Sequence, residues 1–317
     1  MKLVLMATLG LLLASFAHGQ SPVSINCNYS KASALQAVMD RFTEKDLPGV
    51  GISVYSVAEG WWASASGYSQ LESKTRMTTA TVHYLQSVSK TYLAVAILQL
   101  YEQNKISLDD AMDKYLPAKY LRALPHPEAI TIRMLLTHTS GLPEYNSHPR
   151  YTGKVLLNPQ QPVTVDDMVM AVEGEPMQFA PGSKYLYTNT NYLLLALIAD
   201  KITGDHAAYI RKSILQPLQM KHSWYDPARK KVDYPNLTDS YWDILNIGRP
   251  ANITPMQKAN VAPLMGDDGV VSTTTDAVLF LRGLMEGKLL KPSTLALMQQ
   301  WVKNDQGRPV YGLGLIR

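Results

Sequence analysis

The chain has 317 residues, a formal net charge of +4 and a hydrophobic fraction of 46%, which suffices for the core of one or two globular domains. Its single cysteine, Cys27, excludes an internal disulfide. Basic residues are spread along the chain, and we interpret the one tight cluster, Arg229-Lys230-Lys231, as a solvated loop; nucleic acid is therefore not expected among the partners.

The first twenty residues are typical of an export signal. Lys2 precedes an apolar run at residues 3–16 that is short for a stable membrane span. Ala17 and Gly19 place small residues where a signal peptidase cleaves, so we expect a signal peptide over residues 1–19, with an uncleaved anchor as the alternative. Export without disulfides favours a periplasmic or secreted protein with no stable membrane span.

The mature part opens with a helix followed by two strands. Apolar spacing predicts a helix over residues 33–42, with Ser33 as its N-cap. Residues 50–57 are rich in β-formers, and a Glu59-Gly60 turn joins them to residues 61–68. This pattern predicts a β-hairpin.

Helices dominate the rest of the chain. Residues 88–103 are apolar on nearly every face, which indicates a helix buried at the centre of a domain. Further helices are predicted at 130–136, 165–172, 191–202 with Gly204 as the cap, 209–215, 275–285 and 293–302. We therefore predict an α/β domain, formed by residues 20–104 and 262–317, into which residues 105–261 insert an all-α domain.

Ser87-Val88-Ser89-Lys90 begins the apolar helix. A serine and a lysine three residues apart lie on one helical face, and a helix N-terminus stabilises developing negative charge. A buried lysine readily gives up its proton and can serve as a base. A helix cap with an extended lysine is the alternative, but an idle charge amid apolar residues is costly. Ser87 and Lys90 are therefore a candidate nucleophile and base.

Tyr187-Thr188-Asn189 forms a second polar stretch, just before another apolar helix. A phenol can relay a proton, and a carboxamide can hold a substrate carbonyl. By itself the tripeptide also fits an ordinary polar loop.

Taken together, these stretches resemble the serine β-lactamase and penicillin-binding superfamily, in its class C-like branch. Besides the two motifs, residues 130–142, Pro181-Gly182-Ser183 and residues 268–273 resemble family signatures in the same order and spacing. The resemblance implies an α/β fold with an antiparallel sheet flanked by helices. It also implies hydrolysis of a small amide or ester, peptidoglycan-derived compounds among them, without a cofactor.

The resemblance also implies roles for individual residues. Ser87 would form the acyl-enzyme, Lys90 would activate it, and Tyr187 would exchange protons with the leaving group and the attacking water. Asn189 would orient the substrate amide, and the Ser87 N–H would form half of an oxyanion hole. His138, which lies in the helix-to-loop signature, is interpreted as structural.

The chain departs from the family in one respect. The family's third motif, Lys/His-Thr/Ser-Gly, should follow residues 311–315, whereas the sequence ends at Arg317. We therefore expect the C-terminal strands of the sheet to be missing from this chain. A catalytically silent or binding-only fragment of the family is the alternative function.

Other kinds of site are not indicated. No metal-binding motif and no phosphate loop are present. The adjacent aspartates at 109–110, 166–167 and 267–268 are interpreted as charges at helix starts rather than as acid/base pairs.

Overall fold

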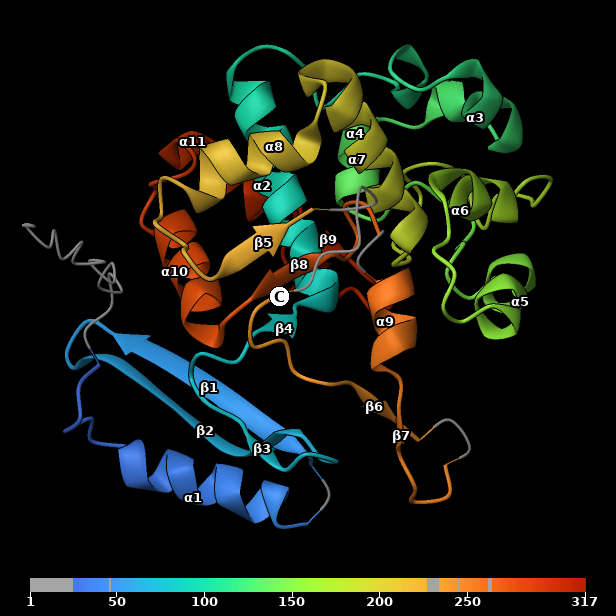
Figure 1. Cartoon of the computed structure of the whole chain (residues 1–317). Helices are drawn as coiled ribbons and strands as arrows, with labels where there is room; N and C mark the ends of the chain where they lie inside the picture. The colour runs from blue at the N-terminus through green and yellow to red at the C-terminus, as the bar shows by residue number, and fades with distance from the viewer. Residues whose placement is uncertain (1–24, 46, 227–233, 244–245, 262–263) are drawn as a thin grey trace, which may run out of the picture.

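The computed structural model describes residues 25–45, 47–226, 234–243, 246–261 and 264–317. The predicted signal peptide (residues 1–19) and the basic cluster at residues 229–231 lie outside these ranges. Three layers form the lower part of the molecule in Figure 1, and a helical part lies above them.

The predicted hairpin is confirmed and forms the sheet of the lower part. β1 (Gly49–Ser56) and β2 (Gly60–Gln70) pair antiparallel, with Gly49 opposite Gly67 and Ser56 opposite Gly60, and β3 (Thr75–Arg76) extends β2. α1 (Ala32–Thr43) packs on one face and α10 (Thr274–Met285) on the other (Figure 1). Within the described residues, β1 has a strand partner on one side only.

α2 (Ser89–Glu102) lies at the centre of the core, as its all-round apolar sequence predicted. Apart from the half-buried Thr91, its residues from Ser89 to Leu100 are buried, and it packs against α7 (Asn189–Thr203) and α8 (His206–Ile210). Tyr92 of α2 stacks on Phe280 of α10 with ring centroids 3.7 Å apart, so the same helix also contacts the layer above β1.

A second small sheet joins distant parts of the chain. β8 (Val270–Ser272) lies between β4 (His83–Tyr84) and β5 (Ser223–Tyr225) and pairs antiparallel with both. It thereby connects the segment before α2 with the segment that follows α8. β5 falls within the residues predicted to form the helical domain, so the two predicted domains share this sheet.

The remaining elements are short. They are η1 (Gln86–Val88), η2 (Met112–Lys114), α3 (Ala118–Ala123), η3 (Pro127–Ala129), α4 (Ile132–Leu136), α5 (Pro149–Leu157), α6 (Val165–Ala171), the π-helical turn η4 (Arg211–Leu215), β6 (Tyr241–Trp242), β7 (Ala251–Asn252), α9 (Thr254–Asn260), α11 (Pro292–Met298), β9 (Val302–Lys303) and β10 (Pro309–Tyr311).

Two local predictions were wrong. Ser33 lies inside α1, whose N-cap is Lys31 and has no side-chain hydrogen bond. The last predicted helix, at 293–302, ends at Met298, after which the chain turns into β9. By contrast, Gly204 caps α7 in the left-handed conformation, as predicted.

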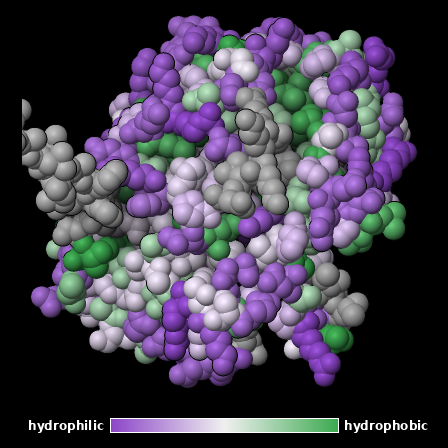
Figure 2. Space-filling view, in the orientation of Figure 1, coloured by the Kyte–Doolittle hydropathy of each residue, from purple (hydrophilic) through white to green (hydrophobic). Residues whose placement is uncertain are grey.

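On the face drawn in Figure 2, hydrophilic residues cover most of the outline, and apolar residues form separate patches among them. The most exposed large apolar side chains, Val57, Leu157 and Ile316, come from distant parts of the chain. Among the described residues, no helix combines the length and hydrophobicity that a membrane crossing requires.

Candidate active site

Ser87 lies in a turn that is held from both sides. It belongs to η1, and the preceding Gln86 has a left-handed backbone with φ 49°. For a residue with a Cβ this conformation is strained, and such strain persists only where the surroundings enforce it. Here β8 does so: the Leu85 N–H donates to the Val270 carbonyl (2.8 Å), and the Val270 N–H donates to Ser89 Oγ (3.1 Å). The turn presents Ser87 at the surface.

Lys90 lies one turn further and is 1% exposed. Its Nζ is 3.0 Å from Ser87 Oγ and donates a 2.8 Å hydrogen bond to the Asp267 carbonyl oxygen. The predicted pair therefore meets in space, within the distance that direct proton transfer requires. The sequence offered no sign of the Asp267 carbonyl, because its position depends on a loop far along the chain.

Tyr187 comes next to this pair from the loop before α7. Lys90 Nζ lies 5.1 Å from the centroid of the Tyr187 ring and 5.9 Å from that of Tyr192, so both aromatic rings pack against the amine. The Tyr187 hydroxyl makes no hydrogen bond with any residue that the structure describes.

Asn189, the first residue of α7, is held by a glutamate that the sequence analysis did not identify. Its N–H and its Nδ2 both donate to Glu144 Oε2, at 2.6 and 3.2 Å. A carboxylate at a helix N-terminus is favoured by the free N–H groups there and by the helix dipole. Glu144 therefore orients the Asn189 carboxamide.

His138 forms the floor beneath Tyr187. Its Nδ1 accepts hydrogen bonds from the Thr188 N–H and from Asn191 Nδ2, both at 3.2 Å, so Nε2 carries the proton. The centroid of its ring lies 4.3 Å from the centroid of the Tyr187 ring and 4.6 Å from that of the Tyr311 ring. Burial, together with the charge of Lys90, lowers the pKa of His138 well below its usual value. A neutral ring that packs between aromatic rings matches the structural interpretation of this residue.

The prediction that Asp267 and Asp268 are charges at a helix start was wrong. They do not begin a helix but occupy the buried loop before β8, beside Lys90. Tyr145 donates a 2.5 Å hydrogen bond to Asp267 Oδ2, whereas Oδ1 of each aspartate lacks a partner among the described residues. Burial raises the pKa of Asp267 to about 6, although the charge of Lys90 opposes the shift. Burial and the charge of Asp267 raise the pKa of Asp268 to about 7.

A separate cavity of about 730 Å³ lies between the start of β1 and β6. Tyr68, His83, Asp239 and Tyr241 are among its lining residues, and Ser87 is not. Since the predicted pair of Ser87 and Lys90 lies elsewhere, the candidate active site is the set of residues around Ser87.

Comparison with known proteins places this site in context. The chain is 30% identical over 203 residues to the protein Flp of Staphylococcus aureus (strain MW2), in a match that covers 62% of this chain and 39% of Flp. It is 28% identical over 269 residues to penicillin-binding protein 4* of Bacillus subtilis (strain 168), covering 79% of this chain and 55% of that protein. The chain thus matches about two fifths to just over half of the length of these curated relatives.

Solved structures show the same fold. A D-stereospecific amidohydrolase from Streptomyces sp. superposes with a TM-score of 0.78 at 24% identity, covering 89% of this chain and 82% of the other. The family model described as Beta-lactamase matches residues 33–314, a range that contains both predicted motifs and nearly all of the described structure. The chain therefore belongs to the beta-lactamase family.

Proposed function

We propose that this chain is a serine hydrolase that cleaves a small amide or ester through an acyl-enzyme on Ser87. One observation carries the proposal: a buried amine, Lys90 Nζ, lies 3.0 Å from the exposed Ser87 hydroxyl. A weak nucleophile requires an adjacent base to become reactive, and this contact provides one.

In the proposed acylation step, Lys90 takes the proton from Ser87 Oγ while Oγ attacks the substrate carbonyl carbon. The oxyanion of the tetrahedral intermediate lies at the Ser87 N–H, where the start of α2 favours negative charge. Collapse breaks the bond to the leaving amine or alcohol, which receives a proton from Tyr187. The Tyr187 hydroxyl suits this task because no described residue occupies it.

Deacylation reverses the roles. Tyr187 withdraws a proton from the attacking water, the acyl group leaves as a carboxylic acid, and Ser87 Oγ regains its proton from Lys90. Asn189, oriented by Glu144, positions the substrate carbonyl beside Ser87. The names of the similar proteins, a D-stereospecific amidohydrolase and a penicillin-binding protein, support amides and β-lactams as compounds to test alongside esters.

Covalent labelling tests the proposal on the full chain. A fluorophosphonate should add one phosphonyl group to Ser87, detected by intact mass and located by peptide mapping. Ser87→Ala should remove the label, and Ser73→Ala, at an exposed serine between β2 and β3, should retain it. Labelling of another serine would refute the assignment. Folded protein that takes up no label would favour the binding-only alternative.

A further inference from the structure

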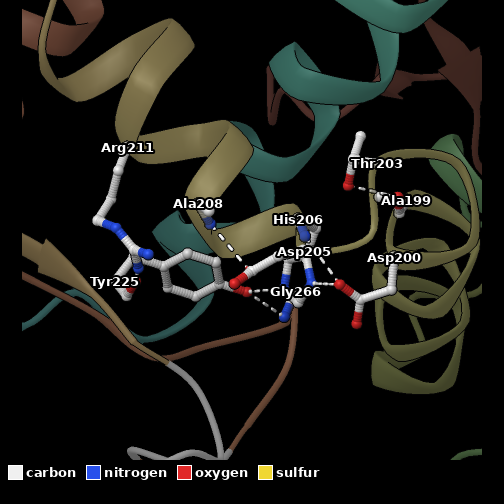
Figure 3. Close-up of polar contacts among 9 residues, drawn as sticks. All are labelled: Ala199, Asp200, Thr203, Asp205, His206, Ala208, Arg211, Tyr225 and Gly266. Atoms are coloured by element: carbon white, nitrogen blue, oxygen red, sulfur yellow. Dashed lines mark hydrogen bonds and ion pairs between the residues drawn. The ribbon is translucent and has the colours of Figure 1, made fainter.

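A chain of hydrogen-bonded polar groups connects α7, α8 and β5 (Figure 3). His206, at the start of α8, is held between Asp200 of α7 and Tyr225 of β5. Its Nδ1 is 2.8 Å from Asp200 Oδ1, and its Nε2 is 2.8 Å from the Tyr225 hydroxyl. His206 and Tyr225 are each 1% exposed, whereas the Asp200 side chain is 22% exposed, so the His206–Tyr225 hydrogen bond forms away from solvent.

The other contact of the Tyr225 hydroxyl shows which groups donate in this series of hydrogen bonds. The Gly266 N–H donates to the Tyr225 oxygen at 2.8 Å. The phenol proton is therefore directed to His206 Nε2, and the Nδ1 proton of His206 to Asp200. Burial raises the pKa of Tyr225 well above its usual value, so the phenol keeps the proton that this arrangement needs. Arg211 Nη1 donates to the Tyr225 carbonyl oxygen at 2.8 Å and holds the backbone of β5.

Gly266 connects this chain to Lys90. The next residue is Asp267, whose carbonyl oxygen accepts the hydrogen bond from Lys90 Nζ. Gly266 has φ 81°, and a Cβ there would lie 2.4 Å from the Tyr192 carbonyl oxygen of α7. The loop therefore packs against α7 at a position where only glycine fits. The Tyr225 hydroxyl holds the Gly266 N–H in place.

We propose that Tyr225, oriented by His206 and Asp200, is a positioning residue for Lys90. By holding the Gly266 N–H it places the Asp267 carbonyl where Lys90 Nζ can bond to it while reaching Ser87 Oγ. This inference rests on the proposed function, because it assigns Tyr225 a part in setting the geometry of the general base. Small displacements of such a group reduce the rate by up to about 100-fold.

Removal of one hydroxyl tests the proposal. Tyr225→Phe in the full chain should lower kcat for a chromogenic ester by about 10- to 100-fold and leave KM within about twofold, because the base is displaced and the substrate contacts are not. Tyr209→Phe is the matched control: it removes a half-buried hydroxyl from α8 that bonds to Gln103 (2.8 Å) and has no link to Gly266. Its kcat should stay at the wild-type value.

Substitutions at His206 separate positioning from general destabilisation. His206→Gln keeps an acceptor for the Tyr225 proton and should retain kcat within a few-fold of wild type. His206→Leu removes that acceptor and should lower kcat as much as Tyr225→Phe does. If Tyr225→Phe and His206→Leu both turn over at the wild-type rate, the inference is wrong. Equal losses of kcat in His206→Gln and His206→Leu would also overturn it. Wild-type protein without a fluorophosphonate label on Ser87 would instead refute the proposed function, and this inference with it.

Discussion

Lys90 occupies an unusual position for a lysine, since its side chain is buried in a helix that is apolar on almost every face. Its hydrogen-bond partners among the described residues are Ser87 Oγ and the Asp267 carbonyl, and two tyrosine rings complete its surroundings. A buried amine with so few partners is a cost to stability that an inert helix would not retain. Its contact with Ser87 agrees with the proposed role of Lys90 as a general base.

Removing this amine should abolish most of the activity. Lys90→Ala should lower kcat/KM for a chromogenic ester by about 10²- to 10⁴-fold, the range that general base assistance contributes. Steady-state kinetics on protein shown to be folded by circular dichroism would measure the loss. Lys105→Ala, at an exposed lysine in the turn after α2, should leave kcat/KM unchanged. Near-wild-type activity of folded Lys90→Ala would contradict the proposed mechanism.

The residues of the candidate site differ in how far the sequence could predict them. Ser87 and Lys90 are three residues apart on one helix, so local spacing was enough to pair them. Glu144 reaches Asn189 from 45 residues away, and Lys90 reaches the Asp267 carbonyl across 177. Such contacts depend on how loops pack, and no local period signals them. For the same reason the buried Asp267 and Asp268 were misread as helix-start charges.

At the scale of elements, two loops are joined beneath Tyr187. The Leu186 N–H donates to the His138 carbonyl (2.9 Å), the Gly182 N–H to Thr139 (2.8 Å), and the Gln178 N–H to Gly141 (2.9 Å). These bonds align the end of α4 with the approach to α7, which explains how two stretches far apart in sequence form one wall of the site. Helices with strong apolar periodicity were predicted well, whereas the N-cap residue of α1 and the C-terminal end of α11 were not.

Two glycines with similar backbones test how rigid that wall is. Gly141 and Gly204 have φ 77° and 80°, but a Cβ at Gly141 would lie 2.3 Å from the Phe179 carbonyl oxygen, and one at Gly204 would meet nothing within 4 Å. Gly204→Ala should cost about 1 kcal/mol of the free energy of unfolding, from backbone strain alone. Gly141→Ala should cost about 2–4 kcal/mol, because overpacking adds to the strain.

Urea unfolding of both variants would give the comparison. Gly141→Ala should also lower kcat, because it would displace the loop that holds His138 beneath Tyr187. Gly204→Ala lies at the far end of α7 and should lose less turnover than Gly141→Ala. Equal destabilisation by the two substitutions would show that the Phe179 segment yields easily, contrary to the rigid wall described above.

At the scale of the whole molecule, β8 is the segment that brings the parts together. It pairs with β4 and β5, and through Leu85 and Ser89 it holds the turn that carries Ser87. The hairpin of β1 and β2 and the central helix could be predicted from period and turn residues. The pairing of β8 could not, because short strands with distant partners have little local signature. The boundaries of the predicted helical domain stay a prediction.

The loop before β8 should also make the stability of the whole molecule depend on pH. Burial raises the pKa values of Asp267 and Asp268 to about 6 and about 7, above the value of about 4 for an aspartate in an unfolded chain. Between about pH 4 and pH 7 the folded state therefore binds more protons than the unfolded state. By linkage, the contribution of this pair to stability is fully present below about pH 4 and is lost as the pH rises through 7.

Asp268→Asn isolates this effect from the other titrating groups. Asparagine resembles the protonated carboxyl, so variant and wild type should have similar free energies of unfolding at pH 4, and the variant should become more stable as the pH rises. The difference should level off just above pH 7 at about 1–4 kcal/mol, since each pKa unit corresponds to about 1.4 kcal/mol. Asp305→Asn, at an exposed carboxyl, should show no such growth. Denaturant unfolding of the three proteins from pH 4 to pH 8 measures both curves. A difference between Asp268→Asn and wild type that shrinks with rising pH would mean that the folded state favours the charged carboxylate, so that Lys90 outweighs the cost of burial.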